Sequence, residues 1–266
     1  MVLTLRHTVM NITQIRNATL KINFAGKTFL IDPMLAEKGA YPGFDGTLNS
    51  HLRNPLVDLP VTLESLFAGV DAVIVTHTHL DHWDEAAEIH LPKSLPIFAQ
   101  HEQDRETIRA AGFSDVRLLT EQSVFGDIML IKTPGQHGSD AIMEKLRDRL
   151  GEVCGVVFRH PQEKTLYLAG DTVWNADVAD NLRRYTPEVI ILNCGDAQVV
   201  GLGSIIMNQQ DVLAVAQYAL NATLIASHME AVNHSALSRT ALRDFLQQNG
   251  VAHQVRIPAD GESCML

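Results

Sequence analysis

The sequence VDAVIVTHTHLDH occupies positions 70–82 and carries the strongest structural signal in the chain. Its first seven residues form an apolar, β-branched run, which is typical of a buried strand. His77 and His79 follow, and alternate side chains of an extended chain point the same way, so both can reach one metal ion. Asp81 and His82 come where the chain leaves the strand, and a turn there can direct them toward a second ion.

The density of this cluster decides between two interpretations. A lone histidine at a strand end is usually a surface residue or a buried group with a hydrogen-bond partner. Three histidines and one aspartate within six residues, directly after a buried strand, are hard to explain in that way. Imidazole and carboxylate donors together favour zinc, manganese, iron or cobalt over calcium. The string therefore predicts a metal site.

Three later side chains are expected to join this cluster. Each directly follows a predicted strand, and α/β folds place their sites at the carboxyl ends of strands. Their shared placement predicts that they meet at one edge of the fold, although each alone is a weak signal. These residues are His137, Asp171 and His228.

The alternation of apolar runs and helical periodicity predicts an α/β fold with mixed sheets and helices outside. No break in composition divides the chain, so we expect one domain over residues 1–266. The segment 36–60 is rich in glycine and proline and predicts a long functional loop. Strands are expected at 18–24, 28–31, 70–76, 95–99, 116–119, 128–133, 153–158, 165–169, 189–193, 223–227 and 255–257, and helices at 84–90, 102–111, 142–150, 209–220 and 235–248.

Composition excludes several classes of protein. Of the 266 residues, 46% are hydrophobic and 20% charged, which is ordinary for a chain that buries a core. The net charge of −10 disfavours binding to nucleic acid, which needs clustered lysine and arginine. No run approaches the ~20 apolar residues of a membrane span, and the first eleven residues, with Arg6 and His7, lack a signal-peptide core. We expect a cytoplasmic protein with no membrane partner and three reduced cysteines.

With these elements in view, the sequence resembles the metallo-β-lactamase superfamily. The resemblance spans nearly the whole chain, from Asp32-Pro33 to the tail at 260–262. Within the superfamily it is most similar to the ascorbate-6-phosphate lactonase-like hydrolases. The elements that carry the resemblance are the H-x-H-x-D-H string at 77–82, the Gly-His-like element at His137, Gly170-Asp171-Thr172, the late histidine His228, Ile31-Asp32-Pro33 and Asn233-His234.

The resemblance implies an αβ/βα four-layer sandwich of two mixed β-sheets with helices on the outer faces. It also implies two divalent metal ions at the upper edge. We expect zinc, while manganese and iron are alternatives that the same donors accept. The resemblance further implies that one ion is bound by His77, His79 and His137 and the other by Asp81, His82 and His228. Asp171 would bridge the two ions.

Such a centre predicts a hydrolase. Two divalent ions ~3.5–4 Å apart hold a shared water as hydroxide near neutral pH, and this hydroxide attacks a carbonyl or phosphoryl centre. Asp171 supplies negative charge between the cations, and Asp81 can orient the nucleophile or protonate the leaving group. We expect a small-molecule substrate that can be anionic and that is a lactone, ester or phosphate ester. The alternatives are a nuclease or phosphodiesterase of the same superfamily and a diiron oxidoreductase, and a homo-oligomer stays open.

Several further residues have two interpretations each. His234 could replace His228 as a ligand, orient a ligand or touch the substrate, as a catalytic residue; the alternative is a helix-start residue capped by Asn233 or Ser235. Asp32 is expected beneath the site, hydrogen-bonded to a ligand. The other candidates are Asn193 and Asp196 as pocket residues, His51 on the long loop, Trp174 as a pocket wall or core residue, and Arg53 or Lys38 as contacts for an anionic group.

Overall fold

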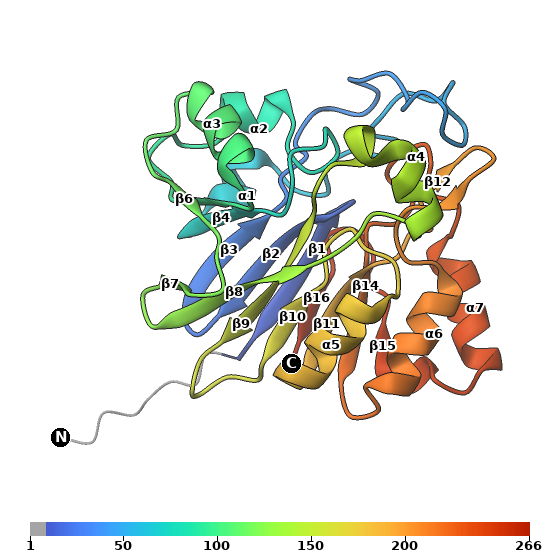
Figure 1. Cartoon of the computed structure of the whole chain (residues 1–266). Helices are drawn as coiled ribbons and strands as arrows, with labels where there is room; N and C mark the ends of the chain where they lie inside the picture. The colour runs from blue at the N-terminus through green and yellow to red at the C-terminus, as the bar shows by residue number, and fades with distance from the viewer. Residues whose placement is uncertain (1–8) are drawn as a thin grey trace.

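Two seven-stranded β-sheets face each other in the computed structural model, which describes residues 9–266 (Figure 1). Helices cover the outer face of each sheet, so the layers run helix, sheet, sheet, helix. The predicted four-layer sandwich is confirmed. Arg6 and His7, named in the expectation for the N-terminus, lie outside the described residues.

The first sheet is mixed, with the order β16-β1-β2-β3-β4-β5-β6. Its strands β16, β1, β2 and β3 pair antiparallel, whereas β3 to β6 pair parallel. The sequence patterns did not predict β1 and β16. The strands are β1 (Asn11–Arg16), β2 (Thr19–Phe24), β3 (Lys27–Ile31), β4 (Ala72–Val75), β5 (Ile97–Ala99), β6 (Val116–Leu118) and β16 (Ser263–Met265).

The second sheet is also mixed, with the order β15-β14-β11-β10-β9-β8-β7. Here β7 to β10 pair antiparallel, and β10, β11, β14 and β15 pair parallel. The strands are β7 (Ser123–Phe125), β8 (Ile128–Pro134), β9 (Cys154–Arg159), β10 (Leu166–Leu168), β11 (Val189–Asn193), β14 (Thr223–Ser227) and β15 (Val255–Arg256), and a separate ribbon pairs β12 (Gln198–Val199) with β13 (Gly203–Ser204).

The helices divide between the two outer faces. Residues of the first three helices pack in one apolar cluster against the first sheet, and those of α5 to α7 pack against the second. The fourth helix packs on the β12–β13 ribbon instead. None of the helices within residues 9–266 is long and apolar enough to cross a bilayer. The helices are α1 (Leu63–Phe67), α2 (Glu85–His90), α3 (Glu102–Ala110), α4 (Asp140–Leu150), α5 (Ala176–Tyr185), α6 (Gln209–Tyr218), α7 (Arg239–Gln248) and the 3₁₀ turn Ala252–Gln254.

The period-two pattern of the strands builds the core. In β3, Phe29 and Ile31 face the second sheet, while Leu30 between them faces the outer helices. The ring of Phe158 in β9 packs against Phe29 and Phe24, at centroid distances of 5.4 and 5.6 Å. Each such fully buried side chain contributes roughly 1.5–3 kcal/mol, so the inter-sheet layer fixes the two sheets relative to each other.

The last helix begins later than the sequence predicted. The prediction placed its start at residue 235, but α7 starts at Arg239, with Ser238 as its N-cap. The backbone before it is held by the loop after β11 instead: Leu237 N donates to Gly195 O (3.0 Å) and Ala236 N to Asp196 O (3.1 Å). His234 therefore does not belong to a helix, and the helix-start interpretation of this residue is wrong.

Candidate metal centre

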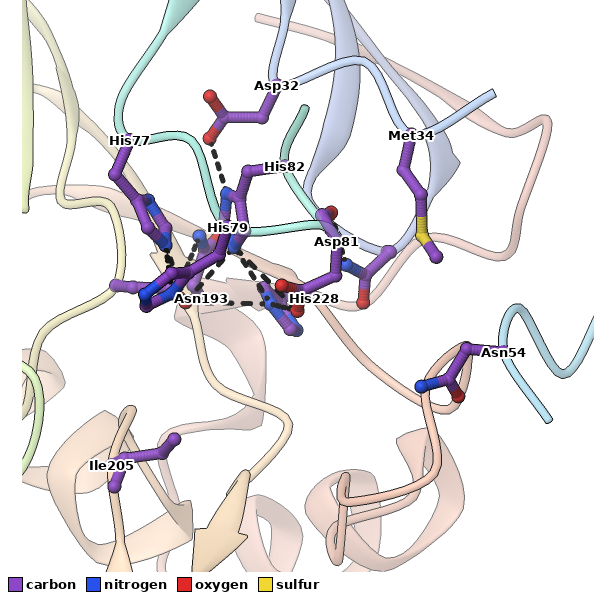
Figure 2. Close-up of polar contacts among 12 residues, drawn as sticks. Asp32, Met34, Asn54, His77, His79, Asp81, His82, Asn193, Ile205 and His228 are labelled. Atoms are coloured by element: carbon purple, nitrogen blue, oxygen red, sulfur yellow. Dashed lines mark hydrogen bonds and ion pairs between the residues drawn. The ribbon is translucent and has the colours of Figure 1, made fainter. Parts of the chain in front are cut away.

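Four chain segments meet at one edge of the two sheets. The segment after β4 carries His77 to His82, and the segments after β8, β10 and β14 carry His137, Asp171 and His228. All seven predicted side chains lie together, and six of them are at most 5% exposed; His79 is the partly exposed one. Figure 2 shows the labelled members pointing toward one another. Residues about 150 positions apart thus share one site.

The first group of donors is His77, His79 and His137, whose nitrogens lie within 4.8 Å of one another. His77 Nε2 is 2.9 Å from His79 Nδ1. His137 Nδ1 donates to Ile205 O (2.9 Å), which leaves Nε2 as the nitrogen on the side of the cluster. That Nε2 atom is buried and has no hydrogen-bond partner among the described residues.

The second group is Asp81, His82 and His228. His228 Nε2 lies 3.3 Å from Asp81 Oδ2 and 3.2 Å from His82 Nε2. Two ligands on a tetrahedral ion with bonds of roughly 2.0–2.1 Å stand about 3.3 Å apart. The donor atoms of both groups therefore have the spacing of ligands around a cation, and the orphaned His137 Nε2 fits such a partner.

Asp171 lies between the groups. Its Oδ2 atom is 3.1 Å from His82 Nε2 and 3.6 to 3.9 Å from the Nε2 atoms of three other imidazoles, those of His137, His228 and His77. Asn193 Nδ2 donates to the other oxygen (2.7 Å) and fixes the carboxylate plane. Asp171 is the carboxylate among the described residues that lies close to histidines of both groups, which is where a bridging carboxylate would sit.

Asp32 orients the His82 ring from below. The Asp32 carboxylate contacts His82 Nδ1 (2.9 Å) and accepts from Thr76 N and Thr76 Oγ1 (2.7 Å each). The Nδ1 contact leaves His82 Nε2 for the cluster, as a carboxylate behind a ligating histidine does. The prediction that Asp32 lies beneath the site is confirmed.

The electrostatics of the cluster favour a cation. Burial lowers the pKa of His77 and His79, and lowers that of His137 to about 4, so these imidazoles are neutral and offer lone pairs. Burial alone would lower the pKa of His82, but Asp171, Asp32 and Asp81 raise it well above its ordinary value. The three carboxylates thus attract one positive charge in the bare protein, and a divalent ion can replace that proton.

Because two histidines are buried, we expect the free energy of unfolding of the metal-free protein to fall at acidic pH. Burial lowers the pKa of His137 and His234 from an ordinary 6.5 to about 4. The unfolded chain keeps the ordinary value and binds more protons between these pH values, so the free energy of unfolding falls as pH drops from about 6.5 to about 4. Each histidine contributes at most about 3 kcal/mol to that fall.

Denaturant titrations of the metal-free protein at about pH 7.5 and about pH 5 measure this effect. We expect the midpoint to be lower at the acidic pH, and His234→Phe to reduce the difference. The same acid-induced fall in wild type and His234→Phe would mean that His234 is not buried as a neutral group; this comparison cancels the opposite contribution of His82, whose pKa is raised.

A cavity of about 140 Å³ opens over the cluster. Its floor includes Asp81, His137 and Asp171. Its walls are mostly apolar and come from the long loop, from α4 and from the β12–β13 ribbon region. The wall residues include Phe44, Thr47, Leu80, Leu150, Val199 and Ile205, and Arg149 and His234 also line it.

His234 and its neighbour form part of the cavity and its cover. The His234 ring is 5% exposed and packs edge-on against Phe44, with centroids 5.0 Å apart. Asn233 Nδ2 donates to Thr47 Oγ1 (2.9 Å) and to Leu48 O (2.6 Å), and its Oδ1 accepts from Phe44 N (3.1 Å). Asn233 is therefore no helix cap: its side chain ties the long loop over the cavity.

Other candidates lie away from the cavity. His51 and Lys38 are exposed, and the Arg53 guanidinium donates to Gly39 O and Ala40 O on its own loop. Trp174 packs in the second-sheet core, 5.4 Å from the Tyr218 ring. Asp196 accepts from Ser204 and Gln198 rather than lining the cavity, so its predicted role is wrong. Phe44 lies on the loop at 36–60 that was expected to be functional, but the sequence singled out neither Phe44 nor Leu80 and Arg149, because these residues carry no metal-site signal.

Comparisons with known proteins show the family of the chain. The model of the beta-lactamase superfamily domain matches residues 27–229. The UPF0173 protein YddR of Bacillus subtilis (strain 168) is 49% identical over 254 residues, covering 96% of this chain and 99% of the relative. A UPF0173 metal-dependent hydrolase of Xanthobacter autotrophicus is 25% identical over 72% of this chain and 74% of its own length.

Two solved structures are similar over almost the whole chain. The isothiocyanate hydrolase from Delia radicum gut bacteria superimposes with a TM-score of 0.94 at 50% identity, covering 97% of this chain and 99% of that one. A possible metal-dependent hydrolase from Veillonella parvula DSM 2008 gives a TM-score of 0.95 at 46% identity, covering 97% and 100%.

The chain belongs to the beta-lactamase superfamily. Within that superfamily it is a metal-dependent hydrolase, with histidine and aspartate clusters able to bind metal. The superfamily predicted from the H-x-H-x-D-H string is confirmed. The narrower resemblance to the ascorbate-6-phosphate lactonase-like group stays a prediction.

Proposed function

We propose that the chain uses two divalent metal ions to hydrolyse a small, largely apolar electrophile, and that the substrate class is an isothiocyanate. The observation that carries the proposal is the apolar cavity seated directly on the two donor groups. The isothiocyanate hydrolase that is 50% identical over nearly both chains supports the substrate class. Lactones and esters, expected from the sequence, present a similar electrophilic carbon and form the second candidate.

The short distances within each donor group indicate which residues would bind each ion. His77, His79 and His137 would hold one ion, Asp81, His82 and His228 the other, and Asp171 would bridge them. When bound, the ions supply the Lewis acidity that makes water nucleophilic at neutral pH. Zinc suits these neutral imidazoles and carboxylates best, and manganese or iron is the alternative.

The chain's own residues would move the protons of the reaction. In hydrolysis of R–N=C=S, the water oxygen bonds to the central carbon, the carbon–nitrogen bond breaks, and the water protons end on nitrogen. The products are R–NH₂ and carbonyl sulfide, which balance one water. Asp81 lies on the cavity floor and can accept a water proton and pass it on. His234, neutral at pH 7 because burial lowers its pKa to about 4, can donate a hydrogen bond to the substrate.

The cavity walls would contact the hydrocarbon group R of the substrate. Leu80, Leu150 and Ile205 offer apolar surface to the hydrocarbon group R. Among the described residues that line the cavity, Arg149 is the one lysine or arginine, and its guanidinium is engaged with Asp45 O. A phosphodiester with polar groups on both sides of the reacting phosphorus would find mostly apolar walls and, among the described residues of the cavity, no cluster of basic side chains beyond the metal centre, which disfavours the nuclease and phosphodiesterase alternative.

A substrate panel tests the class. Phenethyl isothiocyanate, a γ-lactone, p-nitrophenyl acetate and bis-p-nitrophenyl phosphate would each be offered to the metal-loaded enzyme. We expect the highest kcat/KM for the isothiocyanate, measured as amine release. Turnover of the phosphodiester alone would overturn the proposal and favour the nuclease alternative.

Substitution of His234 separates its catalytic role from metal binding. We expect His234→Ala to lower kcat by about 10²-fold, because a hydrogen-bond donor aimed at the charge that develops on the substrate contributes about this much, with metal content unchanged. His234→Gln, which keeps a donor, should recover part of the loss. The exposed His253 provides the control variant His253→Ala, which should behave as wild type. Loss of metal from His234→Ala would make it a ligand rather than a substrate contact.

A further inference from the structure

The turn between β1 and β2 contains Asn17, a fully buried residue in the left-handed backbone region, with φ of 54°. Asparagine adopts this region more readily than most other residues with a side chain. No sequence pattern marks Asn17 as part of the site. Its hydrogen bonds nevertheless reach two members of the second donor group, Asp81 and His228.

The side chain and the backbone of Asn17 bind different segments. Asn17 Nδ2 donates to the carbonyl oxygen of Asp81 (2.9 Å), and Asn17 O accepts from the backbone N–H of His228 (3.0 Å). Asp81 follows β4 of the first sheet, whereas His228 follows β14 of the second. One residue therefore joins the backbones of two donors that come from opposite sheets.

Two buried side chains hold the Asn17 carbonyl in place. Gln14 Nε2 donates to it (2.8 Å), and Ser227 Oγ approaches it at 3.2 Å. Ser227 Oγ also donates to Gln14 Oε1 (2.8 Å), which closes the network. Gln14, Asn17 and Ser227 are at most 1% exposed, so water does not compete for these bonds. These bonds fix the backbone of Asn17, and the fixed backbone places its side-chain amide against the Asp81 carbonyl.

We infer that Asn17 is a positioning residue that sets the separation of Asp81 and His228 and so the affinity of the second metal ion. The inference rests on the proposed two-ion site. Asp81 Oδ2 and His228 Nε2 stand 3.3 Å apart, and ligand atoms need to hold their places to about 0.5 Å to bind tightly. Without the amide, the Asp81 carbonyl loses a buried donor and the turn that carries Asp81 can shift away from His228.

The substitution Asn17→Gly isolates this contact. Glycine accepts the positive φ and keeps the backbone carbonyl for His228, so only the amide is lost. We expect the second ion to bind about 10- to 100-fold more weakly, as when a group supporting a ligand is removed, and the first ion to bind as in wild type. Asn17→Asp is an isosteric second variant: it places a carboxylate oxygen opposite the Asp81 carbonyl and should weaken the same ion.

Asn23→Gly is the matched control, because Asn23 lies in the same hairpin and its Nδ2 contacts Thr28 Oγ1 far from the cluster. Metal-stripped variants would be titrated with zinc against a chromophoric chelator, and circular dichroism would verify the fold. The expected result is loss of affinity for one ion in both Asn17 variants and two tight ions in Asn23→Gly.

Two outcomes would overturn the inference. Two tight ions in either folded Asn17 variant would remove the positioning role. Equal weakening of both ions would show a general structural role instead. A wild-type protein that binds fewer than two ions would contradict the proposed function itself, so the two failures are distinguishable.

Discussion

Replacing Asp171 with asparagine is expected to lower kcat/KM by about 10³-fold or more. The Asp171 carboxylate lies within 3.1 to 3.9 Å of four imidazole nitrogens, which belong to both sets of donors. Asparagine has the same shape but no charge, so it would remove the anion from between the two proposed cations, which repel each other. Metal content should fall with activity, since a bridging ligand serves both ions.

Asp196→Asn is the control for this substitution. Asp196 is also a carboxylate near the end of β11, but it accepts from Ser204 and Gln198 rather than from the cluster. Its loss should leave activity and metal content close to wild type. If Asp171→Asn kept both ions and more than about a tenth of the activity, the bridging role would be wrong.

Removing the His79 imidazole should lower kcat/KM by a similar factor, about 10³-fold. His79 Nδ1 is 2.9 Å from His77 Nε2 and completes the first donor group with His137. His79 is also the partly exposed member of the seven, so its truncation leaves a smaller buried void than truncation of the others. We therefore expect His79→Ala to unfold at nearly the wild-type temperature while it loses turnover.

His51→Ala tests whether the loss is specific to the cluster. His51 belongs to the long loop but is exposed and does not line the cavity. Wild-type turnover in His51→Ala together with inactive, folded His79→Ala supports the assignment. A His79→Ala enzyme with full activity would refute the first donor group.

Much of the fold and most of the site could be predicted because their signals are local. The strand before His77 is a continuous apolar run, and the donors follow it directly. His137, Asp171 and His228 follow similar runs, and the geometry of parallel strands brings their carboxyl ends to one edge. Local chemistry and strand direction were therefore enough to predict that these side chains converge.

Residues whose roles depend on long-range contacts were not predictable in this way. Asn17 and Asn233 form hydrogen bonds to segments 64 and up to 189 positions away. Nothing in the sequence marks Asn17, and Asn233-His234 contributes to the resemblance without indicating that Asn233 ties the long loop. The start of α7 was misplaced because the pairing of residues 236 and 237 with the loop after β11 overrides helical propensity there. The helix α5 was missed although Val178, Leu182 and Tyr185 have helical spacing and Asn175 caps it.

The lining of the cavity was the least predictable feature of the site. The cavity walls come from the loop at 36–60, from α4 and from the β12–β13 ribbon, which meet only in the folded chain. The sequence indicated lactones, esters or phosphate esters through its resemblance to a family. The mostly apolar walls over the donor groups carry our proposal of a small apolar electrophile, and lactones and esters stay the second candidate.

Anomalous diffraction from crystals of the metal-loaded protein tests the central claim most directly. Data collected on both sides of the zinc absorption edge would locate each bound ion. The account predicts two peaks about 3.5–4 Å apart, one beside His77, His79 and His137 and one beside Asp81, His82 and His228, with Asp171 between them. A single peak, or peaks away from these side chains, would contradict it.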